Sequence, residues 1–258
     1  MKGRYRSPAV DWFAEQALYA LDSLRALDLA VVPSSQRSAC RATNLSHWPF
    51  VALYRQTTER QFSLAHHSAS PAYQFALIHH FYRLFQRSVI HRAADIQGDS
   101  IRRTMLWDVY FDGLTQYPWS PSEFRSTVAA AVRAHIEGDL CEAMILAWRD
   151  LSLVSGHPPD LAAVRSTLFN PAGRRIYADA TTAFVSRLRI AAAENPSLLG
   201  LLGTNLASPR GWWRHPLLHP RAIRWRRWRA WIKAAAILRL EASMVRSSDR
   251  SGQSLVWR

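Results

Sequence analysis

The stretch SPSEFRSTVAAAVRAHIEGDLCEAMILAWRDL, residues 120–151, decides the fold class of this chain. Ser120, Pro121 and Glu123 form a capping box, with proline at the first helical position, which marks the start of a helix. Apolar residues then recur every three or four positions, which predicts one long amphipathic helix ending near Leu151. The apolar stripe consists of Val128, Val132, Ile136, Leu140, Ala143 and Leu146.

The rest of the chain repeats this helical pattern. The whole sequence has 10 glycines in 258 residues, and glycine weakens helices more than any residue except proline. Further helices are expected near residues 8–27, 47–64, 71–91, 100–117, 160–169, 172–194 and 221–245, with irregular chain at 30–45 and 195–219. No alternation typical of strands persists. We therefore predict an all-α fold, a single multi-helix bundle over residues 1–246 with a C-terminal basic amphipathic helix, followed by a flexible tail at 247–258.

The chain is strongly basic. Lys and Arg number 33 against 19 Asp and Glu, which gives a formal net charge of +14. Such a charge attracts nucleic acid, anionic lipid or acidic protein. Only Lys2 and Lys233 are lysines, so a genome that favours arginine codons is an equally good explanation of the charge.

The sequence predicts a cytoplasmic protein. Asp11, Glu15 and Asp22 interrupt the start of the chain, which argues against a secretory signal. No apolar run reaches the roughly 18 residues that a membrane span needs. Two cysteines, Cys40 and Cys141, are too few for a disulfide framework. Peripheral attachment to a membrane stays open.

His135 and Asp139 are the first candidate site residues. They lie four positions apart on or beside the apolar stripe of the long helix, so their side chains are neighbours. An ionisable pair on a buried face is costly unless it is paired or ligated. The pair is therefore either a structural hydrogen bond, a pair of metal ligands, or a general base oriented by a carboxylate. Gly138 between them is unusual inside a helix.

Two other predicted helices carry further candidates. Asp108 and Asp112 form an i, i+4 acidic pair on a helix that is apolar nearly all round and therefore expected to be central. Two carboxylates there would repel each other unless a cation, protons or arginines intervene. His80 borders the apolar face of the helix at 71–91.

These five residues suggest a metal centre inside the bundle. Facing helices of a bundle build metal sites from inward side chains. A mixed set of His80, Asp108, Asp112, His135 and Asp139 suits Zn²⁺, Mn²⁺ or Fe²⁺. In that hypothesis His135, Asp139 and Asp112 are also the catalytic residues. The alternative is that the five side chains are scattered and paired with arginines.

The C-terminal segment from Arg221 to Leu240, RAIRWRRWRAWIKAAAILRL, is the second signal. A helical wheel gathers its tryptophans and aliphatic residues on one side and several basic residues on the other. We expect this helix either to dock on the bundle, to lie on an anionic membrane or to contact nucleic acid. The candidate polyanion-binding residues are Arg221, Arg224, Trp225, Arg226, Trp228, Arg229 and Lys233.

Several short motifs resemble a family of uncharacterised bacterial all-helical proteins. Ala134-His135-Ile136 followed by Asp139-Leu140 is similar to its Ala-His-Ile-x-x-Asp-Leu motif. Phe50, Leu53-Tyr54 and Thr57 resemble an earlier motif, and Tyr110-Phe111 a later one. The similarity spans about residues 45–150 and implies a helical fold without implying an activity.

A second resemblance is to zinc-dependent phospholipase C and the related single-strand nucleases. These are helical and carry a His-x-x-x-Asp motif on a central helix, like His135 and Asp139. The resemblance implies that these two residues are metal ligands. The chain lacks the His-x-x-x-Glu partner motif, so a trinuclear zinc site is not expected.

Two functions follow from these patterns. The first is a bacterial enzyme with a polar pocket in its bundle, acting on a small-molecule substrate as a metal-assisted hydrolase. The second is a non-enzymatic accessory protein that binds nucleic acid or an anionic membrane through its basic, Trp- and Arg-rich surface. Convergence of the five candidate ligands in one pocket would favour the enzyme.

Overall fold

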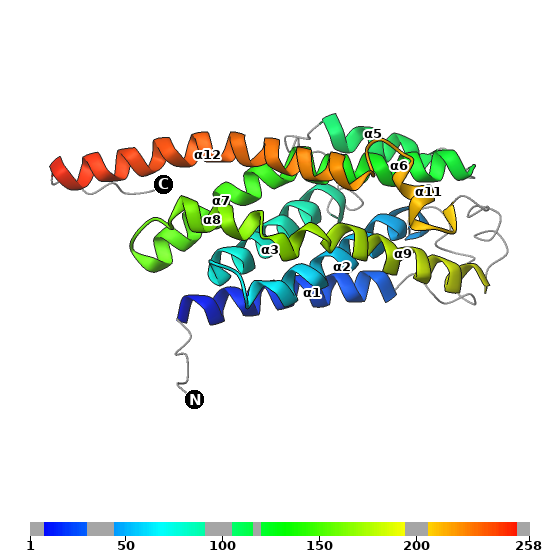
Figure 1. Cartoon of the computed structure of the whole chain (residues 1–258), viewed down its shortest axis with the longest axis horizontal. Helices are drawn as coiled ribbons and strands as arrows, with labels where there is room; N and C mark the ends of the chain where they lie inside the picture. Colours follow the sequence, from blue (N-terminus) through cyan, green and yellow to red (C-terminus); the bar gives the residue numbers. More distant parts are fainter. Residues whose placement is uncertain (1–7, 30–43, 91–104, 116–119, 194–205, 252–258) are drawn as a thin grey trace.

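A computed structural model describes residues 8–29, 44–90, 105–115, 120–193 and 206–251 and confirms the all-α prediction, since no strand occurs in these ranges (Figure 1). The α-helices are α1 (Pro8–Leu29), α2 (Asn44–Ala65), α3 (Pro71–Phe85), α5 (Met105–Thr115), α6 (Pro121–Arg133), α7 (Leu140–Ser155), α8 (Leu161–Leu168), α9 (Ile176–Ala193), α11 (Pro209–Trp213) and α12 (Pro220–Ser251). Two π-helical segments, η2 (Gln86–Ile90) and η3 (Ala134–Asp139), and one 3-10 turn, η4 (Pro171–Arg174), complete them.

The helices pack around α3 and the continuous rod formed by α6, η3 and α7. Helix α1 lies against α2 and α3, α3 packs on α7, and α12 crosses α7 and η3 on the opposite side (Figure 1). Buried apolar residues from α1 to α12 join in one hydrophobic cluster. Its largest fully buried side chains include Trp107, Trp148 and Trp212. Burial of these apolar surfaces is the main force that holds the bundle together.

Capping residues, among them the predicted capping box at Ser120, explain where several helices begin and end. The Ser120 hydroxyl accepts a hydrogen bond from the Glu123 amide at 3.3 Å, and the Glu123 carboxylate accepts one from the Ser120 amide at 2.7 Å. Asp160 accepts hydrogen bonds from the first amides of α8 in the same way. Helix α7 ends at Gly156, whose φ of 72° is a left-handed conformation that favours glycine.

The structure differs from the sequence predictions in three elements. The helix expected at 121–151 is continuous to Ser155 but contains the π-helical segment η3. The last helix continues to Ser251, past its predicted end near 245. The stretch expected to be irregular contains the short helix α11. The predicted start of the helix at residue 100 and residues 252–258 of the predicted tail lie outside the described residues.

Helix α5 lies at the edge of the bundle, which corrects the expectation that it is central (Figure 1). Trp107 and Tyr110 are buried, whereas Val109 and Asp112 are exposed. Its inner side approaches α6 closely at Gly113, where an added Cβ would lie 2.8 Å from the Thr127 hydroxyl. The apolar residues of α5 therefore do not all face the core. Trp107 and Tyr110 are buried, whereas Val109 is apolar and exposed.

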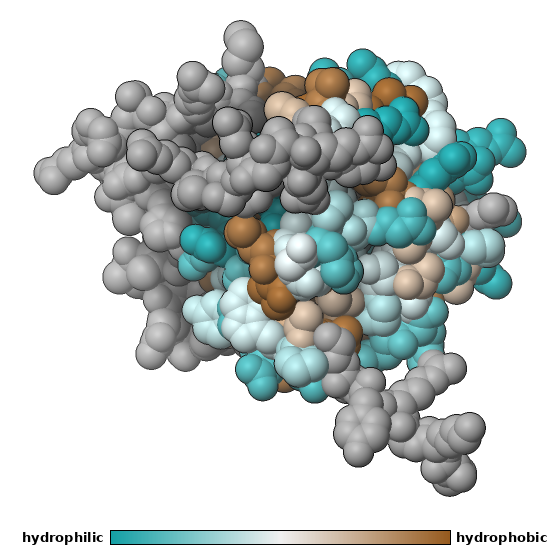
Figure 2. Space-filling view, turned by 90° about the vertical axis from the view of Figure 1, so that its left-hand side faces the viewer, coloured by the Kyte–Doolittle hydropathy of each residue, from teal (hydrophilic) through white to brown (hydrophobic). Residues whose placement is uncertain are grey.

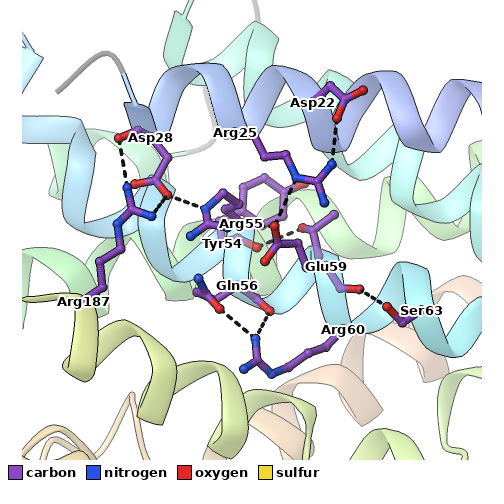
Figure 3. A network of polar contacts seen from close by, with 11 residues as sticks. Asp22, Arg25, Asp28, Tyr54, Arg55, Gln56, Glu59, Arg60, Ser63 and Arg187 are labelled. Carbon is purple, nitrogen blue, oxygen red and sulfur yellow. Dashed lines mark hydrogen bonds and ion pairs between the residues drawn. The ribbon is translucent and has the colours of Figure 1, made fainter. Parts of the chain in front are cut away.

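A polar network joins α1, α2 and α9 (Figure 3). The buried Asp28 carboxylate pairs with Arg55, and Arg187 lies 3.0 Å away on its other side. The Arg55 guanidinium also reaches Glu59 at 2.7 Å. Several of the chain's arginines are thus used to hold helices together.

No helix in the described ranges is both long and apolar enough to cross a membrane. The end of the molecule drawn in Figure 2 carries hydrophobic residues dispersed among hydrophilic ones.

Candidate functional site

The π-helical segment η3 positions the predicted His135–Asp139 pair. Nδ1 of His135 lies 3.0 Å from Oδ2 of Asp139, and both residues are buried. A π-helical turn holds more residues than an α-helical turn, so side chains four positions apart lie more nearly in line. Gly138 falls inside the same turn. The unusual glycine of the sequence therefore marks a local change of helix type, and π turns of this kind are frequent at functional sites.

Trp107 of α5 completes the surroundings of the Asp139 carboxylate. Its indole Nε1 donates to both carboxylate oxygens, at 3.2 and 3.3 Å. A carboxylate only accepts hydrogen bonds, so the proton between His135 and Asp139 belongs to Nδ1 of His135. Nε2 of the neutral ring is then an acceptor. This order, carboxylate to Nδ1–H with a free Nε2, is the arrangement that orients a histidine as an acceptor or base.

Aromatic rings surround the His135 imidazole. It stacks on Phe81 with ring centroids 3.5 Å apart, and Tyr54 meets it edge-on at 4.4 Å. Burial lowers the pKa of His135, although the hydrogen bond from its ring to Asp139 opposes that effect. The ring is therefore held in its neutral form. Among the described residues, the buried Nε2 of His135 has no hydrogen-bond partner.

A cavity of about 80 Å³ lies beside His135; we call it the inner cavity. Apolar side chains of α2, α3, η3 and α12 form most of its wall, among them Phe50, Phe81 and Ile223. Its polar lining comes from His135, Tyr54, Thr57, Gln61, Tyr177 and Arg227. The buried Tyr54 hydroxyl also has no hydrogen-bond partner within the described ranges. Burial first, and then the nearby Asp139 carboxylate, raises the pKa of Tyr54 well above its usual value.

His80 lies apart from the His135–Asp139 pair. Its Nε2 lies 2.8 Å from the carboxylate of Asp150, eleven residues beyond Asp139. Eleven residues of helix correspond to roughly 16 Å along the axis, which separates the two pairs. Burial lowers the pKa of His80, and Asp150 partly opposes this. His80 is therefore a buried histidine that pairs with its own carboxylate, Asp150.

The two aspartates of α5 do not join the pair in a metal centre. Asp112 is exposed and Asp108 is half-buried on the helix whose Trp107 faces Asp139. Asp108 lies next to Trp107 in sequence, so its side chain points about 100° away around the helix. In the described ranges, no three His, Cys, Asp or Glu side chains are placed to hold one ion. The expected convergence of five ligands is thus reduced to one pair, and metal binding itself stays a prediction.

Helix α12 docks on the bundle through a narrower face than the sequence predicted. Its buried residues are Ile223, Ala230, Trp231, Ala234, Ala235, Leu238 and Glu241. Trp225 and Ile232, expected on the docked face, are 54% and 51% exposed. The small alanines in the buried stripe let α12 approach closely, so the larger side chains at the edge of the stripe remain outside. The buried Glu241 carboxylate accepts hydrogen bonds from Arg149 of α7.

A groove of about 750 Å³ runs between the first turns of α12 and the segment of α8, η4 and the start of α9; we call it the arginine groove. Its basic residues are Arg165, Arg221, Arg224 and Arg227, and no carboxylate of the described residues lines it. Its other lining residues are Leu168, Phe169, Asn170, Gly173, Tyr177, Pro220, Ile223, Trp225 and Trp228. The groove therefore combines positive charge with aromatic rings.

The groove arginines have no carboxylate partner within the described ranges, whereas many arginines elsewhere are paired. Among the described residues, Arg227 donates to the Leu168 carbonyl, at 3.0 Å, and burial lowers its pKa. Arg226 differs, because its Nε lies 2.7 Å from Glu137 and it also donates to the Leu217 carbonyl. Arg226, one of the predicted polyanion-binding residues, is thus already paired with a carboxylate.

The aromatic rings of the groove are already in contact with arginines. The Arg165 guanidinium lies over the Trp228 ring at 5.3 Å, and Phe169 meets Trp228 edge-on at 5.3 Å. Arg229 lies over Trp225 at 4.8 Å. Arg229 and Lys233 are exposed but lie outside the groove lining. Of the seven predicted polyanion-binding residues, Arg221, Arg224, Trp225 and Trp228 line the groove.

Sequence reasoning missed the half of the groove that comes from α8, η4 and α9. Arg165 and Phe169 lie four residues apart, a spacing that places them on one side of a helical turn. That spacing was a visible signal, but nothing in the sequence indicated that this turn faces α12. Arg227 was missed because several arginines lie close to it in sequence, and the sequence alone does not show which of them is buried.

No family model, no curated protein and no solved structure matches the chain. The two resemblances based on short motifs therefore stay predictions. The functional argument has to come from the two cavities themselves.

Proposed function

We propose that this protein binds single-stranded nucleic acid in the arginine groove. One observation carries the proposal: four arginines without carboxylate partners in the described ranges line a single groove that no carboxylate enters. A buried or half-buried guanidinium without an anion is unfavourable, as Arg227 illustrates, and a phosphate would satisfy it.

The aromatic rings supply the second requirement of a single-strand site. Proteins that bind single strands combine a basic track for phosphates with rings on which bases stack. Trp225 is 54% exposed and Trp228 is 38% exposed, so each ring offers surface to a ligand. Arg229 already covers one face of Trp225, which leaves the other face for a base.

The concave shape favours a strand over a bilayer surface. A membrane presents a flat array of headgroups, whereas the four groove arginines surround a volume of about 750 Å³. The metal-assisted hydrolase is less well supported, because His80 pairs with Asp150 and Asp112 is exposed. The geometry thus favours the accessory-protein alternative.

Fluorescence anisotropy with a labelled twelve-residue oligothymidylate tests the proposal. If four phosphates are neutralised, the logarithm of the association constant should fall with the logarithm of salt concentration with a slope of about −2.8. The double variant Arg221→Gln/Arg224→Gln should reduce that slope to about −1.4, since each lost phosphate contact removes about 0.7. Trp225→Ala should weaken binding by about 1–3 kcal/mol through lost stacking.

Arg25→Gln is the matched control. Arg25 of α1 is exposed, but it is paired with Asp22 of α1 and Glu59 of α2, outside the groove lining. Arg25→Gln removes one charge, as the single substitution Arg224→Gln does, and should leave the affinity nearly unchanged. Equal weakening by both substitutions would mean that only net charge is felt, and would refute the groove. Binding to vesicles of anionic lipid without binding to oligothymidylate would assign the basic surface to membranes instead.

A further inference from the structure

His135 lines the inner cavity, and the described part of the fold leaves its Nε2 without a partner. His135 is 4% exposed, its Nδ1–H is used by Asp139, and its Nε2 has no hydrogen-bond partner among the described residues. A buried polar atom left unsatisfied costs free energy, so such an atom in a native structure calls for an explanation. The Asp139–Trp107 arrangement fixes the tautomer, so the atom can only accept a hydrogen bond.

The walls of the cavity define what can reach this acceptor. Phe50, Tyr54 and Phe81 bring aromatic rings around it, and aliphatic residues supply most of the remaining lining. A volume of about 80 Å³ is several times the roughly 10–15 Å³ that one water needs. Mostly apolar walls with the His135 acceptor among a few polar groups suit an apolar group that carries a donor.

We propose that the inner cavity binds a small ring that carries one N–H or O–H donor, with Nε2 of His135 accepting the hydrogen bond. The apolar walls hold the ring, and the acceptor selects rings with a donor over rings without one. Asp139 acts as the positioning residue, because it holds the ring of His135 in the tautomer that accepts.

The cavity shares part of its wall with the arginine groove. Leu168, Tyr177, Ile223 and Arg227 line both. A strand whose phosphates lie in the groove therefore has a ring-binding site within reach, and an unpaired base is a ring with N–H donors. The identification of the ring with a base rests on the proposed function, whereas ring binding itself does not.

Phenol and benzene test the ring site, since they differ only in the hydroxyl donor. Titration of the full chain is expected to show saturable binding of phenol. In wild type, ¹⁵N NMR should show the Nε2 resonance of His135 moving with phenol and not with benzene. In His135→Phe, the ratio of the benzene Kd to the phenol Kd should fall about tenfold, the scale of one hydrogen bond. Absence of phenol binding to wild type, or an unmoved Nε2 resonance, would overturn the ring site even if His135→Phe fails to fold.

Two controls separate this inference from the proposed function. Arg224→Gln lies in the groove and outside the inner cavity, so it should leave phenol binding unchanged while weakening oligothymidylate binding. His135→Phe should weaken oligothymidylate binding several-fold if a base enters the cavity. An unchanged affinity for oligothymidylate in a folded His135→Phe protein would overturn the base identification alone.

Discussion

Nδ1 of His135 donates to Asp139 across a single π-helical turn, at 3.0 Å, in a site where both side chains are almost completely buried. The same carboxylate accepts from Trp107, so one acidic side chain ties α5 to the long helix. This relationship gives Asp139 two roles that can be separated by experiment: it stabilises the contact between helices, and it sets the tautomer of His135.

Asp139→Asn is expected to lower the free energy of unfolding by about 1–3 kcal/mol, because an amide cannot accept from both Trp107 and His135 as well as a carboxylate does. Urea unfolding followed by circular dichroism measures the loss. The tautomer of His135 should change as well, which ¹⁵N NMR detects. Glu142→Gln, an exposed acidic position on α7, is the control and should stay within about 0.5 kcal/mol of wild type. Equal effects of the two substitutions would contradict the role of Asp139.

Trp231 and Trp225 of α12 differ strongly in burial. Trp231 is 5% exposed and Trp225 is 54% exposed. Trp231→Ala should therefore cost about 3–5 kcal/mol of unfolding free energy, because it opens a cavity against the bundle. Trp225→Ala should cost less than about 1 kcal/mol, since it loses mainly the contact with Arg229. Thermal and urea unfolding of the two variants compare them. A similar loss in both would mean that the docked face of α12 is the one the helical wheel predicted.

The comparison of α12 with its helical wheel shows how far sequence reasoning reaches. Periodicity and the capping box at Ser120 were enough to predict an all-helical protein, because such signals act locally. The helical wheel predicted that Trp225 and Trp231 both belong to the docked face, because both are apolar. Which of the two is buried depends on the alanines that let α12 approach α7, and that contact is a property of the fold.

The candidate site was predictable to a similar extent. The pairing of His135 with Asp139 followed from spacing along one helix. The π turn that aligns them and the Trp107 donor did not, because they depend on how α5 packs. The pairing of His80 with Asp150 joins residues 70 positions apart, which a single sequence cannot indicate. The sequence shows that the C-terminal helix is basic. Only the fold shows that Arg226 pairs with Glu137 whereas Arg224 lines the groove.

Asp28 and Asp22 provide a matched test of buried and exposed ion pairs on one helix (Figure 3). The Asp28 side chain is 1% exposed and faces both Arg55 and Arg187, whereas Asp22 is 59% exposed and pairs with Arg25. Asp28→Asn should cost about 3–5 kcal/mol, because it leaves two arginines without their shared carboxylate. Asp22→Asn should cost no more than about 1 kcal/mol. Urea unfolding of both variants measures the difference, and a small effect of Asp28→Asn would show that Glu59 alone satisfies Arg55.

Acidification is expected to destabilise the protein through its buried histidines. Burial lowers the pKa of His135 and of His80, and burial with the neighbouring charges of His80 and Arg83 lowers the pKa of His79 to about 4. In the unfolded chain these rings take up protons near pH 6.5, so the unfolded state binds more protons than the folded state below that pH. Their contribution to stability is therefore complete above about pH 6.5 and is lost as the pH falls toward the folded pKa values.

The free energy of unfolding should accordingly be lower at pH 5 than at pH 7.5, by on the order of 1–2 kcal/mol. Urea unfolding at a series of pH values gives the slope. His135→Gln lowers stability at neutral pH but removes one of the titrating rings, so its free energy should depend less steeply on pH than that of wild type. Glu142→Gln is again the control and should keep the wild-type slope between pH 5 and 7.5. A stability that rises on acidification would mean that these rings gain protons on folding, which would contradict the neutral His135 on which the acceptor role of Nε2 depends.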